Sequence, residues 1–354
     1  MTHKLFIMNF GSTSTKVAVF EDEKELAKET LRHSQDVLNQ FENVIAQKDF
    51  RKEAINEFLK NNNYKLDEFD CIVVRGAPSK PIDGGIYAVT DVMLNDLKSG
   101  KYGYHASCLG CIVGDELAKS ANIPIITADT PATDELCSLA RYTGLKGMDK
   151  KTTFHALNHK AIARQYAKEH NTNYENLNLI VAHLGGGISV GAHEKGKVID
   201  TNNALDGDGT FSPERAGTLP TGALVELCFS GNYTIEEIKK MLAGKGGTMS
   251  YLGTNDGLEI EKRIDAGDGF AKEVFEAMAY QISKEIGSDA AVLCGKVDAI
   301  LLTGSLAYSK MLTNWIKERV EFIAPVFIYA GENEMLSLAQ SGIRFLEGEK
   351  LKTY

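Results

Sequence analysis

The sequence predicts an α/β protein built from two related halves, each with a mixed β-sheet and flanking helices. Apolar, β-prone segments alternate with helical patterns along the 354 residues, as in α/β folds. A strand, a turn of small residues and a second strand occur in this order twice, around residues 11–15 and around residues 185–187. This repetition indicates an internal duplication. We therefore expect two domains, residues 1–149 with 331–354 and residues 150–330, that share a cleft.

Short apolar runs bounded by small or polar residues predict the strands. They lie at residues 5–11, 16–20, 71–74, 123–128, 179–184, 188–192, 197–199, 297–302 and 325–329. Apolar residues at spacings of three and four predict the helices, which lie at residues 53–60, 156–169, 270–286 and 335–346.

The composition excludes several classes of protein. With 43% hydrophobic and 25% charged residues, the chain is ordinary for a globular protein, which excludes intrinsic disorder and small disulfide scaffolds. Its 39 basic and 48 acidic residues give a net charge of −9, and no basic patch occurs, so we expect no nucleic-acid partner. No export signal is visible and no run approaches the ~18 apolar residues of a membrane helix. We expect a cytoplasmic protein whose Cys108 and Cys111 are unpaired thiols, since a second zinc-binding pair is missing.

The two turns of small residues are candidate phosphate-binding sites. Glycine lacks a Cβ, so backbone N–H groups can approach a ligand, and such nests bind anions. Each turn alone suits an ordinary tight hairpin, but two of them, flanked by Lys16 and His183, favour a bound nucleotide. No GxxxxGK[ST] motif occurs, and the alternating segment 188–192 stands where a Rossmann site requires a helix.

Charged residues near the expected strand ends supply the other groups that phosphoryl transfer needs. Arg75 suits a carboxylate or phosphate ligand, although an ion pair between strands is an equal alternative. Asp129, together with Glu334, offers oxygen ligands for Mg²⁺. His155 and His159 share one helix face, but the absence of HExxH disfavours zinc. Phosphoryl transfer depends on positioning and charge neutralisation, which these groups provide, whereas no GxSxG hydrolase motif occurs.

Taken together, the motifs resemble the acetate and butyrate kinase family, part of the actin-like ATPase superfamily with sugar kinases and Hsp70. They are NFGSTSTK (residues 9–16), VRG (74–76), ADTP (128–131), FHALNH (154–159), AHLGGG (182–187), FSPER (211–215), LTG (302–304) and GENE (331–334). Within this family the chain is most similar to butyrate kinases, because of SPERAGTLP (212–220) and YLGTND (251–256).

The resemblance implies two ribonuclease H-like domains, each with a mixed five-stranded sheet, around a cleft. The first domain would bind the acyl group and phosphate, and the second the nucleotide. The implied reaction is the reversible, Mg²⁺-dependent transfer of the ATP γ-phosphoryl group to the carboxylate of butyrate or a branched-chain analogue, which forms an acyl phosphate and ADP. A homodimer or higher homo-oligomer is also implied.

The resemblance further assigns roles to the matched residues. Those implied to be catalytic are Arg75, Asp129, His155, His183 and Arg215, the last in place of an arginine that acetate kinases carry in a longer loop. Those implied to bind ATP or ADP are Asn9, Gly11, Ser12, Ser14, Lys16, Gly185, Gly186, Gly187, Thr254, Asn255, Gly304 and Ser305. Asp129 and Glu334 would bind Mg²⁺. Ser107 stands at the position of a family histidine, with His105 close by.

Gly76, Ala77, Phe154 and Pro213 are implied to line the acyl pocket. Acetate kinases have two valines where this chain has Gly76 and Ala77, which leaves room for a longer acid. Each buried methylene contributes about 0.8 kcal/mol, so we expect roughly 10–200-fold discrimination between neighbouring acids. An acetate or propionate kinase, and a nucleotide-switched scaffold of the actin or Hsp70 type, are the alternative functions.

Overall fold

The computed structural model describes residues 2–205 and 207–354, and the chain divides into two compact units. The N-terminal unit comprises Met1–Asp134 and Asn333–Tyr354, and the C-terminal unit comprises Glu135–Glu332. The first boundary lies earlier in the chain than the expected division at residue 149. The second lies close to the expected return at residue 331.

The N-terminal unit contains a six-stranded mixed sheet with the order β3-β2-β1-β4-β6-β5. β1, β2 and β3 are antiparallel neighbours, β4 and β6 run parallel to β1, and β5 is antiparallel to β6. The expected number of five strands is therefore wrong for this unit, because the short β5 adds an edge strand. The elements are β1 (Lys4–Phe10), β2 (Ser14–Glu21), β3 (Lys24–Arg32), α1 (Gln35–Leu38), η1 (Ile45–Gln47), α2 (Lys48–Asn61), η2 (Leu66–Glu68), β4 (Cys71–Arg75), β5 (Ile86–Ala88), α3 (Asp91–Ser99), α4 (Cys108–Ala121), β6 (Ile125–Ala128) and α13 (Glu334–Leu346).

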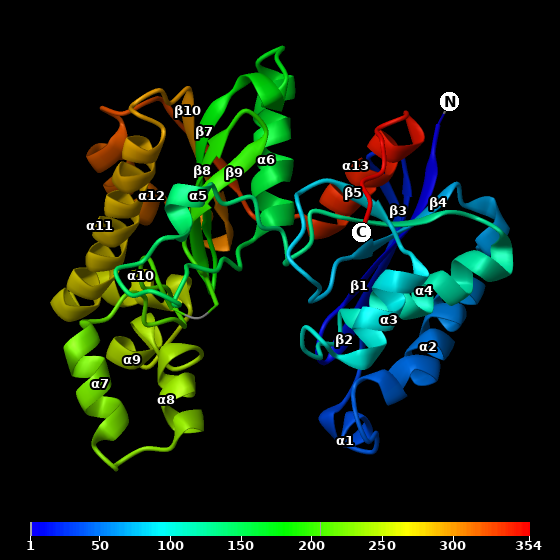
Figure 1. Cartoon of the computed structure of the whole chain (residues 1–354), viewed down its shortest axis with the longest axis horizontal. Coiled ribbons are helices and arrows are strands. Elements are labelled where there is room, and N and C mark those ends of the chain that lie inside the picture. The colour runs from blue at the N-terminus through cyan, green and yellow to red at the C-terminus, as the bar shows by residue number, and fades with distance from the viewer. Residues whose placement is uncertain (1, 206) are drawn as a thin grey trace. The chain divides into compact units, whose positions relative to one another are not determined.

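Helices cover both faces of this sheet (Figure 1). Val73 and Val74 are consecutive in β4, so their side chains point to opposite faces. Val74 packs against Gly114 of α4, whereas Val73 packs against Gly342 of α13. A Cβ at Gly342 would lie 2.9 Å from Val73 Cγ2, so the missing side chain lets α13 approach the sheet this closely.

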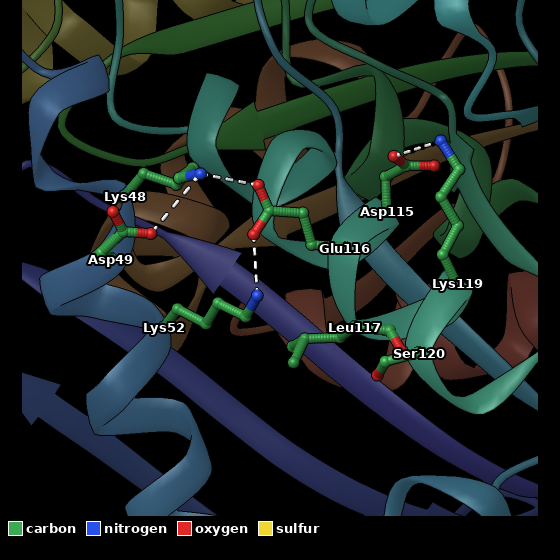
Figure 2. Close-up of polar contacts among 8 residues, drawn as sticks. All are labelled: Lys48, Asp49, Lys52, Asp115, Glu116, Leu117, Lys119 and Ser120. Carbon is green, nitrogen blue, oxygen red and sulfur yellow. Dashed lines mark hydrogen bonds and ion pairs between the residues drawn. The ribbon is translucent and has the colours of Figure 1, made fainter.

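Two ion pairs hold α2 against α4 (Figure 2). Glu116 of α4 accepts hydrogen bonds from Lys48 Nζ at 2.7 Å and from Lys52 Nζ at 2.8 Å, both on α2. Each pair is partly exposed and by itself contributes little to stability. The buried apolar side chains of α2, which include Ile55 and Phe58, supply most of the packing energy. This helix also carries Arg51, which contacts the first turn of small residues.

The C-terminal unit repeats the same topology with five strands in the order β11-β10-β7-β8-β9. β7, β8 and β9 are antiparallel neighbours, and β10 and β11 run parallel to β7. This order matches β6-β4-β1-β2-β3 and confirms the duplication. The elements are α5 (Ser138–Arg141), α6 (Ala156–Glu169), η3 (Tyr174–Asn176), β7 (Asn178–Leu184), β8 (Ile188–Glu194), β9 (Lys197–Thr201), α7 (Thr221–Phe229), α8 (Ile235–Leu242), α9 (Gly247–Leu252), α10 (Gly257–Asp265), α11 (Gly269–Val292), β10 (Ala299–Gly304), η4 (Ser305–Tyr308), α12 (Lys310–Val320) and β11 (Val326–Ala330).

This second sheet is also covered on both faces (Figure 1). Leu179 and Val181 of β7 pack with α6, whereas Ile180 and Ala182 pack with α11 and α12. The helix expected at residues 156–169 coincides with α6, and the other three expected helices lie within α2, α11 and α13. The remaining helices, α1, α3, α4, α5, α7 to α10 and α12, had no sequence prediction, and neither had the strand β3. Within the described residues, no helix combines the length and apolar character needed to cross a bilayer.

Candidate active site

Three parallel strands bring polar groups to one edge of the N-terminal sheet. The strands β1, β4 and β6 end near Asn9, Arg75 and Asp129, respectively, and run in the same direction. Glu334 Oε1 lies 3.0 Å from Arg75 Nε, and Asn9 Nδ2 donates to Glu334 Oε2 at 2.6 Å. The sequence analysis allowed an ion pair between strands as an alternative role for Arg75. Arg75 does form an ion pair, but with Glu334 at the start of α13. Among the described residues, the two Nη atoms of Arg75 have no hydrogen-bond partner, so they can bind an anion.

Asp129 is held in a specific backbone conformation at this edge. Its φ is 42°, in the left-handed region, and its side chain is 2% exposed. Its Oδ1 accepts a hydrogen bond from the Gly85 amide at 2.7 Å, which ties the end of β6 to the segment before β5. No group of three or more His, Cys, Asp or Glu side chains in residues 2–205 and 207–354 is arranged to hold a metal ion. Mg²⁺ is usually held by one or two carboxylates together with phosphate oxygens and water, and its assignment to Asp129 and Glu334 stays a prediction.

Arg51 organises the turn between β1 and β2, and sequence reasoning did not identify it. The side chain is fully buried. Its Nη1 donates to the Gly11 and Ser14 carbonyls at 2.8 and 3.2 Å, and its Nη2 donates to the Ser12 carbonyl at 2.8 Å. The Arg51 guanidinium thus binds three carbonyl groups of the turn, while Ser12 and Lys16 are exposed to solvent. Burial lowers the pKa of Arg51 to about 10, so the guanidinium is still charged at neutral pH.

His105 is the histidine that accompanies Arg75 in the N-terminal unit. Its Nδ1 lies 2.9 Å from Ser107 Oγ, at the start of α4. Burial lowers the pKa of His105, and the positive charges of Arg75 and Arg51 lower it further. His105 therefore supplies an imidazole near Arg75, and the match of Ser107 to a family histidine stays a prediction.

The four expected acyl-pocket residues lie in two different units. A Cβ at Gly76 would lie 2.4 Å from Thr130 Cβ, and this contact accounts for the glycine without reference to the substrate. Ala77 is 4% exposed and belongs to the core of the N-terminal unit. In the C-terminal unit, Phe154 is buried against the His159 ring at 5.3 Å between centroids. The acyl-pocket assignment stays a prediction.

A cavity of about 420 Å³ in the C-terminal unit brings several expected nucleotide-binding residues together. It lies at the carboxyl ends of β7 and β10. A Cβ at Gly304, whose φ is 89°, would lie 2.3 Å from the Leu184 carbonyl oxygen, so only glycine allows these strand ends to approach. The residues that line the cavity include Gly185, Gly186, Pro213, Asn255 and Ser305. Pro213, expected at the acyl group, therefore lies with the expected nucleotide residues.

The segment at residues 212–215 packs directly on the glycine turn. Ser212 Oγ donates to the Gly186 carbonyl at 2.6 Å, and the Glu214 amide donates to the same carbonyl at 3.2 Å. Glu214 also accepts from Arg215 Nη1 at 3.2 Å and from Asn255 Nδ2 at 2.6 Å. Glu214 thus connects Arg215 with Asn255, which is expected to bind the nucleotide. The sequence gives no signal for this contact beyond the place of Glu214 in the FSPER motif.

His155 and His183 lie against each other in the C-terminal unit. Their rings stack with centroids 3.8 Å apart and an interplanar angle of 14°. His183 Nδ1 lies 2.8 Å from Asn158 Oδ1, and its Nε2 would be 2.9 Å from a Cβ at Gly185. Burial, followed by the charges of His155 and His159, lowers the pKa of His183 well below 6.5. His183 is therefore a neutral imidazole at pH 7, fixed beneath the glycine turn.

Replacing Arg51 with lysine should destabilise the protein. Lysine keeps the charge but lacks the planar fork that binds three carbonyls at once, so we expect a loss of about 2–4 kcal/mol in the free energy of unfolding. Urea unfolding measures this loss, and faster amide exchange at Gly11 and Ser14 would locate it. The matched control is Arg32→Lys on the exposed side of β3. Equal unfolding midpoints for the two variants would contradict the role of Arg51.

The stability of the C-terminal unit should decrease as the pH falls from 7 to 5. Burial lowers the pKa values of His159, His183 and His193 well below the value of 6.5 for an exposed histidine. Below pH 6.5 the unfolded chain therefore binds more protons than the folded one, so acidification favours unfolding. Each histidine contributes up to about 1.4 kcal/mol per pH unit.

Fluorescence of Trp315, the single tryptophan of the chain, reports this unfolding because Trp315 lies in α12. We expect the urea midpoint to fall across this pH range, and His193→Gln to reduce the slope by roughly one third. A midpoint that does not change between pH 7 and pH 5 would refute the prediction.

Comparison with known proteins agrees with this architecture. The acetokinase family matches residues 136–324. The chain is 52% identical over 355 residues to butyrate kinase 2 of Clostridium acetobutylicum and 51% identical over 355 residues to a probable butyrate kinase of Clostridium botulinum, with 100% of each chain covered in both cases. Its fold resembles that of Porphyromonas gingivalis acetate kinase, with a TM-score of 0.79 at 19% identity over 97% of this chain and 100% of that one.

A more distant structural neighbour is a ROK family protein from Streptococcus pneumoniae, with a TM-score of 0.54 at 13% identity, covering 97% of this chain and 99% of that chain. These neighbours, together with the strand order that both units share, confirm the expected actin-like ATPase fold. The family expected from the motifs is confirmed as well. Because the family match covers residues 136–324 and the identity to butyrate kinases extends over the whole chain, the chain belongs to the acetokinase family.

Proposed function

We propose that this protein is a short-chain fatty acid kinase that reversibly transfers the γ-phosphoryl group of ATP to butyrate or a branched-chain analogue, forming an acyl phosphate and ADP. The observation that carries the proposal is Arg75, which Glu334 holds through Nε while both Nη atoms stay unpaired among the described residues. A guanidinium in this state suits two oxygens of a carboxylate or of an acyl phosphate. The butyrate kinases that are about half identical over the whole chain support the choice of acid.

The proposed reaction does not require the protein to remove a proton from the acid. A fatty-acid carboxylate has a pKa near that of a glutamate side chain, about 4.3, so it is ionised at neutral pH and needs no general base. The barrier comes from the approach of two anions, which is costly at low effective dielectric. Arg75 and Lys16 would offset this repulsion on the acid side, and His155 and the neutral His183 would donate hydrogen bonds to the transferred group. Mg²⁺, when held by Asp129 and Glu334, supplies further charge neutralisation.

We assign nucleotide binding to the cavity of the C-terminal unit. The glycine turn at residues 185–187 and the Gly304–Ser305 segment offer backbone amides for phosphates, and Asn255 and Tyr308 also line the cavity. In the N-terminal unit, Asn9, Gly11, Ser12 and Ser14 would contact phosphate oxygens. ATP and ADP are the nucleotides that the acetokinase family supports. The cytoplasmic location and the homodimer or higher homo-oligomer stay predictions, and sedimentation velocity tests the latter.

An acid panel tests the proposed function. We expect ADP release that depends on the added acid, with kcat/KM for butyrate and isobutyrate above that for acetate by roughly 10–200-fold. A coupled assay with acetate, propionate, butyrate and isobutyrate measures these values. A preference for acetate or propionate would favour the alternative kinase. If no acid stimulates ADP release, the kinase function is wrong and a nucleotide-switched scaffold becomes the better interpretation.

Replacing Arg75 with lysine tests the residue that carries the proposal. Lysine lacks the fork that binds two oxygens, so we expect kcat/KM for the acid to fall by at least about 100-fold, while the circular dichroism spectrum is retained. The matched control is Arg344→Lys in α13 of the same unit, where the arginine pairs with Glu349 at 2.8 Å. Near-normal turnover by the Arg75 variant would exclude its contact with the substrate.

A further inference from the structure

In the N-terminal unit, the backbone that follows β6 and begins with Asp129 is held by a second segment, residues 82–85. The Gly85 amide donates to Asp129 Oδ1 at 2.7 Å, and the Asp129 amide donates back to the Gly85 carbonyl at 3.0 Å. Farther along, the Asp134 amide donates to the Ile82 carbonyl at 2.8 Å. Residues 82–85 thus hold both the backbone and the carboxylate of Asp129.

A third segment, residues 351–354, lies along the outer edge of β5, the strand that continues from residues 82–85. Tyr87 of β5 pairs with Thr127 of β6 on one side and forms a bridge with Lys352 on the other. The Lys352 amide donates to the Ile86 carbonyl at 2.8 Å. β5 is the last strand of the sheet and has only three residues, and such short edges are commonly covered by another segment. Residues 351–354 provide this cover.

The side chain of Lys352 covers Gly85 directly. A Cβ at Gly85 would lie 2.9 Å from Lys352 Cε and 3.1 Å from its Cδ, so the aliphatic part of the lysine packs on the glycine. The φ of Gly85 is 134°, which residues with a Cβ rarely adopt, so glycine allows both the turn and the contact. Lys352 Nζ lies 3.8 Å from Asp83 Oδ2, but this exposed ion pair contributes little. The packing on Gly85 is the contact that matters here.

Tyr354 anchors this third segment. Its hydroxyl donates to Asp96 Oδ2 of α3 at 3.0 Å, and its ring packs against the core of the N-terminal unit. Burial, followed by the hydrogen bond to Asp96, raises the pKa of Tyr354 to about 12, so the phenol keeps its proton at neutral pH. Lys80 Nζ, just before residues 82–85, lies 4.4 Å from the centre of the same ring, a distance at which a cation is attracted to the ring. Tyr354 is thus tied both to α3 and to the segment that holds Asp129.

We propose that Lys352 and Tyr354 are positioning residues for Asp129. They hold residues 82–85 against the end of β6, and this keeps the Gly85 amide on the Asp129 carboxylate. The two residues act only through Gly85 and make no contact with a substrate themselves. The part that Asp129 plays in phosphoryl transfer rests on the proposed function, but the support of Gly85 does not.

The consequence for catalysis is an Asp129 carboxylate of fixed direction. One of its oxygens is held by the Gly85 amide in a buried hydrogen bond, so the carboxylate cannot rotate without breaking that bond. If residues 82–85 were loose, water would compete for the Gly85 amide and the carboxylate would take several orientations. A misplacement of about 1 Å at a catalytic group can lower turnover by roughly 100-fold. Support of residues 82–85 therefore affects the rate and not only the stability.

Amide hydrogen exchange, followed by ¹⁵N NMR, tests the support of Gly85 without any substrate. Lys352→Pro removes the amide that donates to Ile86, so exchange at Gly85 and Asp129 should become about tenfold faster, the size of one lost hydrogen bond. The matched control is Lys350→Pro, because the Lys350 amide has no acceptor among the described residues. Equal exchange at Gly85 in the two variants would overturn the proposal.

Two tyrosine variants test the anchor at Tyr354 with a smaller change. Tyr354→Phe removes only the hydroxyl that donates to Asp96, and exchange at Gly85 should become several-fold faster. Tyr104→Phe, which removes an exposed phenol from the same unit, should leave this exchange unchanged. Identical exchange at Gly85 in the two variants would remove Tyr354 from the proposal. If Lys352→Pro does not fold, Lys352→Gly replaces it, since it removes the side chain that covers Gly85 and should also accelerate exchange there.

Kinetics then separate this inference from the proposed function. With an active acid, Lys352→Gly should lower kcat by about tenfold with KM for the acid nearly unchanged, because Arg75 is untouched. Lys352→Met keeps an unbranched side chain over Gly85 and should restore most of kcat, whereas an equal loss in both variants would overturn the packing argument. Unchanged kcat in Lys352→Gly alongside faster exchange would overturn the catalytic part. Failure of every acid to turn over in the unmodified protein would refute the proposed function and leave the exchange result standing.

Discussion

The ion pair between Arg75 and Glu334 is the interaction on which the N-terminal unit depends. Arg75 ends the central strand β4, and Glu334 begins α13, far along the chain. The pair therefore requires the C-terminal segment to return and cover the first sheet. Asn9 binds the second oxygen of the same carboxylate, so the ends of β1, β4 and α13 are tied to one group. Breaking this contact would leave Arg75 without its anionic partner and Glu334 with only Asn9, so the ends of β4 and α13 would no longer be tied together.

Three buried polar side chains, Arg51, Asp129 and His183, are each oriented by a hydrogen bond to a neighbouring group. Arg51 is held by carbonyls of the turn that it organises, and Asp129 is held by the Gly85 amide. His183 is held by Asn158. Where burial removes water, each unmade hydrogen bond is costly, so such groups have a single favourable orientation. This is the kind of preorganisation that electrostatic catalysis requires.

Much of the framework was predictable because it depends on local patterns. α6 was expected with its observed bounds, and the two hairpins are confirmed as β1–β2 and β7–β8. Two strands were missed: β5, which has only three residues and pairs with β6, and β3, which is mostly exposed and so lacks an apolar run. α4 was missed because Cys108 and Cys111 were considered only as a possible zinc-binding pair and not as part of a helix. At Gly76 the sequence alone was misleading about the reason for the glycine. The sequence suggested space for a substrate, whereas in the structure a side chain at this position would collide with Thr130.

By itself, the sequence determined the duplicated α/β architecture, the family and the identity of the polar residues at the strand ends, because periodicity and short motifs are local properties of the chain. Only the tertiary structure decided the partners of those residues. That Arg75 pairs with Glu334, that Arg51 lies beneath the first turn, and that Lys352 covers the glycine that holds Asp129 all follow from packing between segments distant in sequence. The physical reason is that a buried polar group takes its orientation from whichever neighbour the fold brings within hydrogen-bond distance, and no local pattern encodes that neighbour.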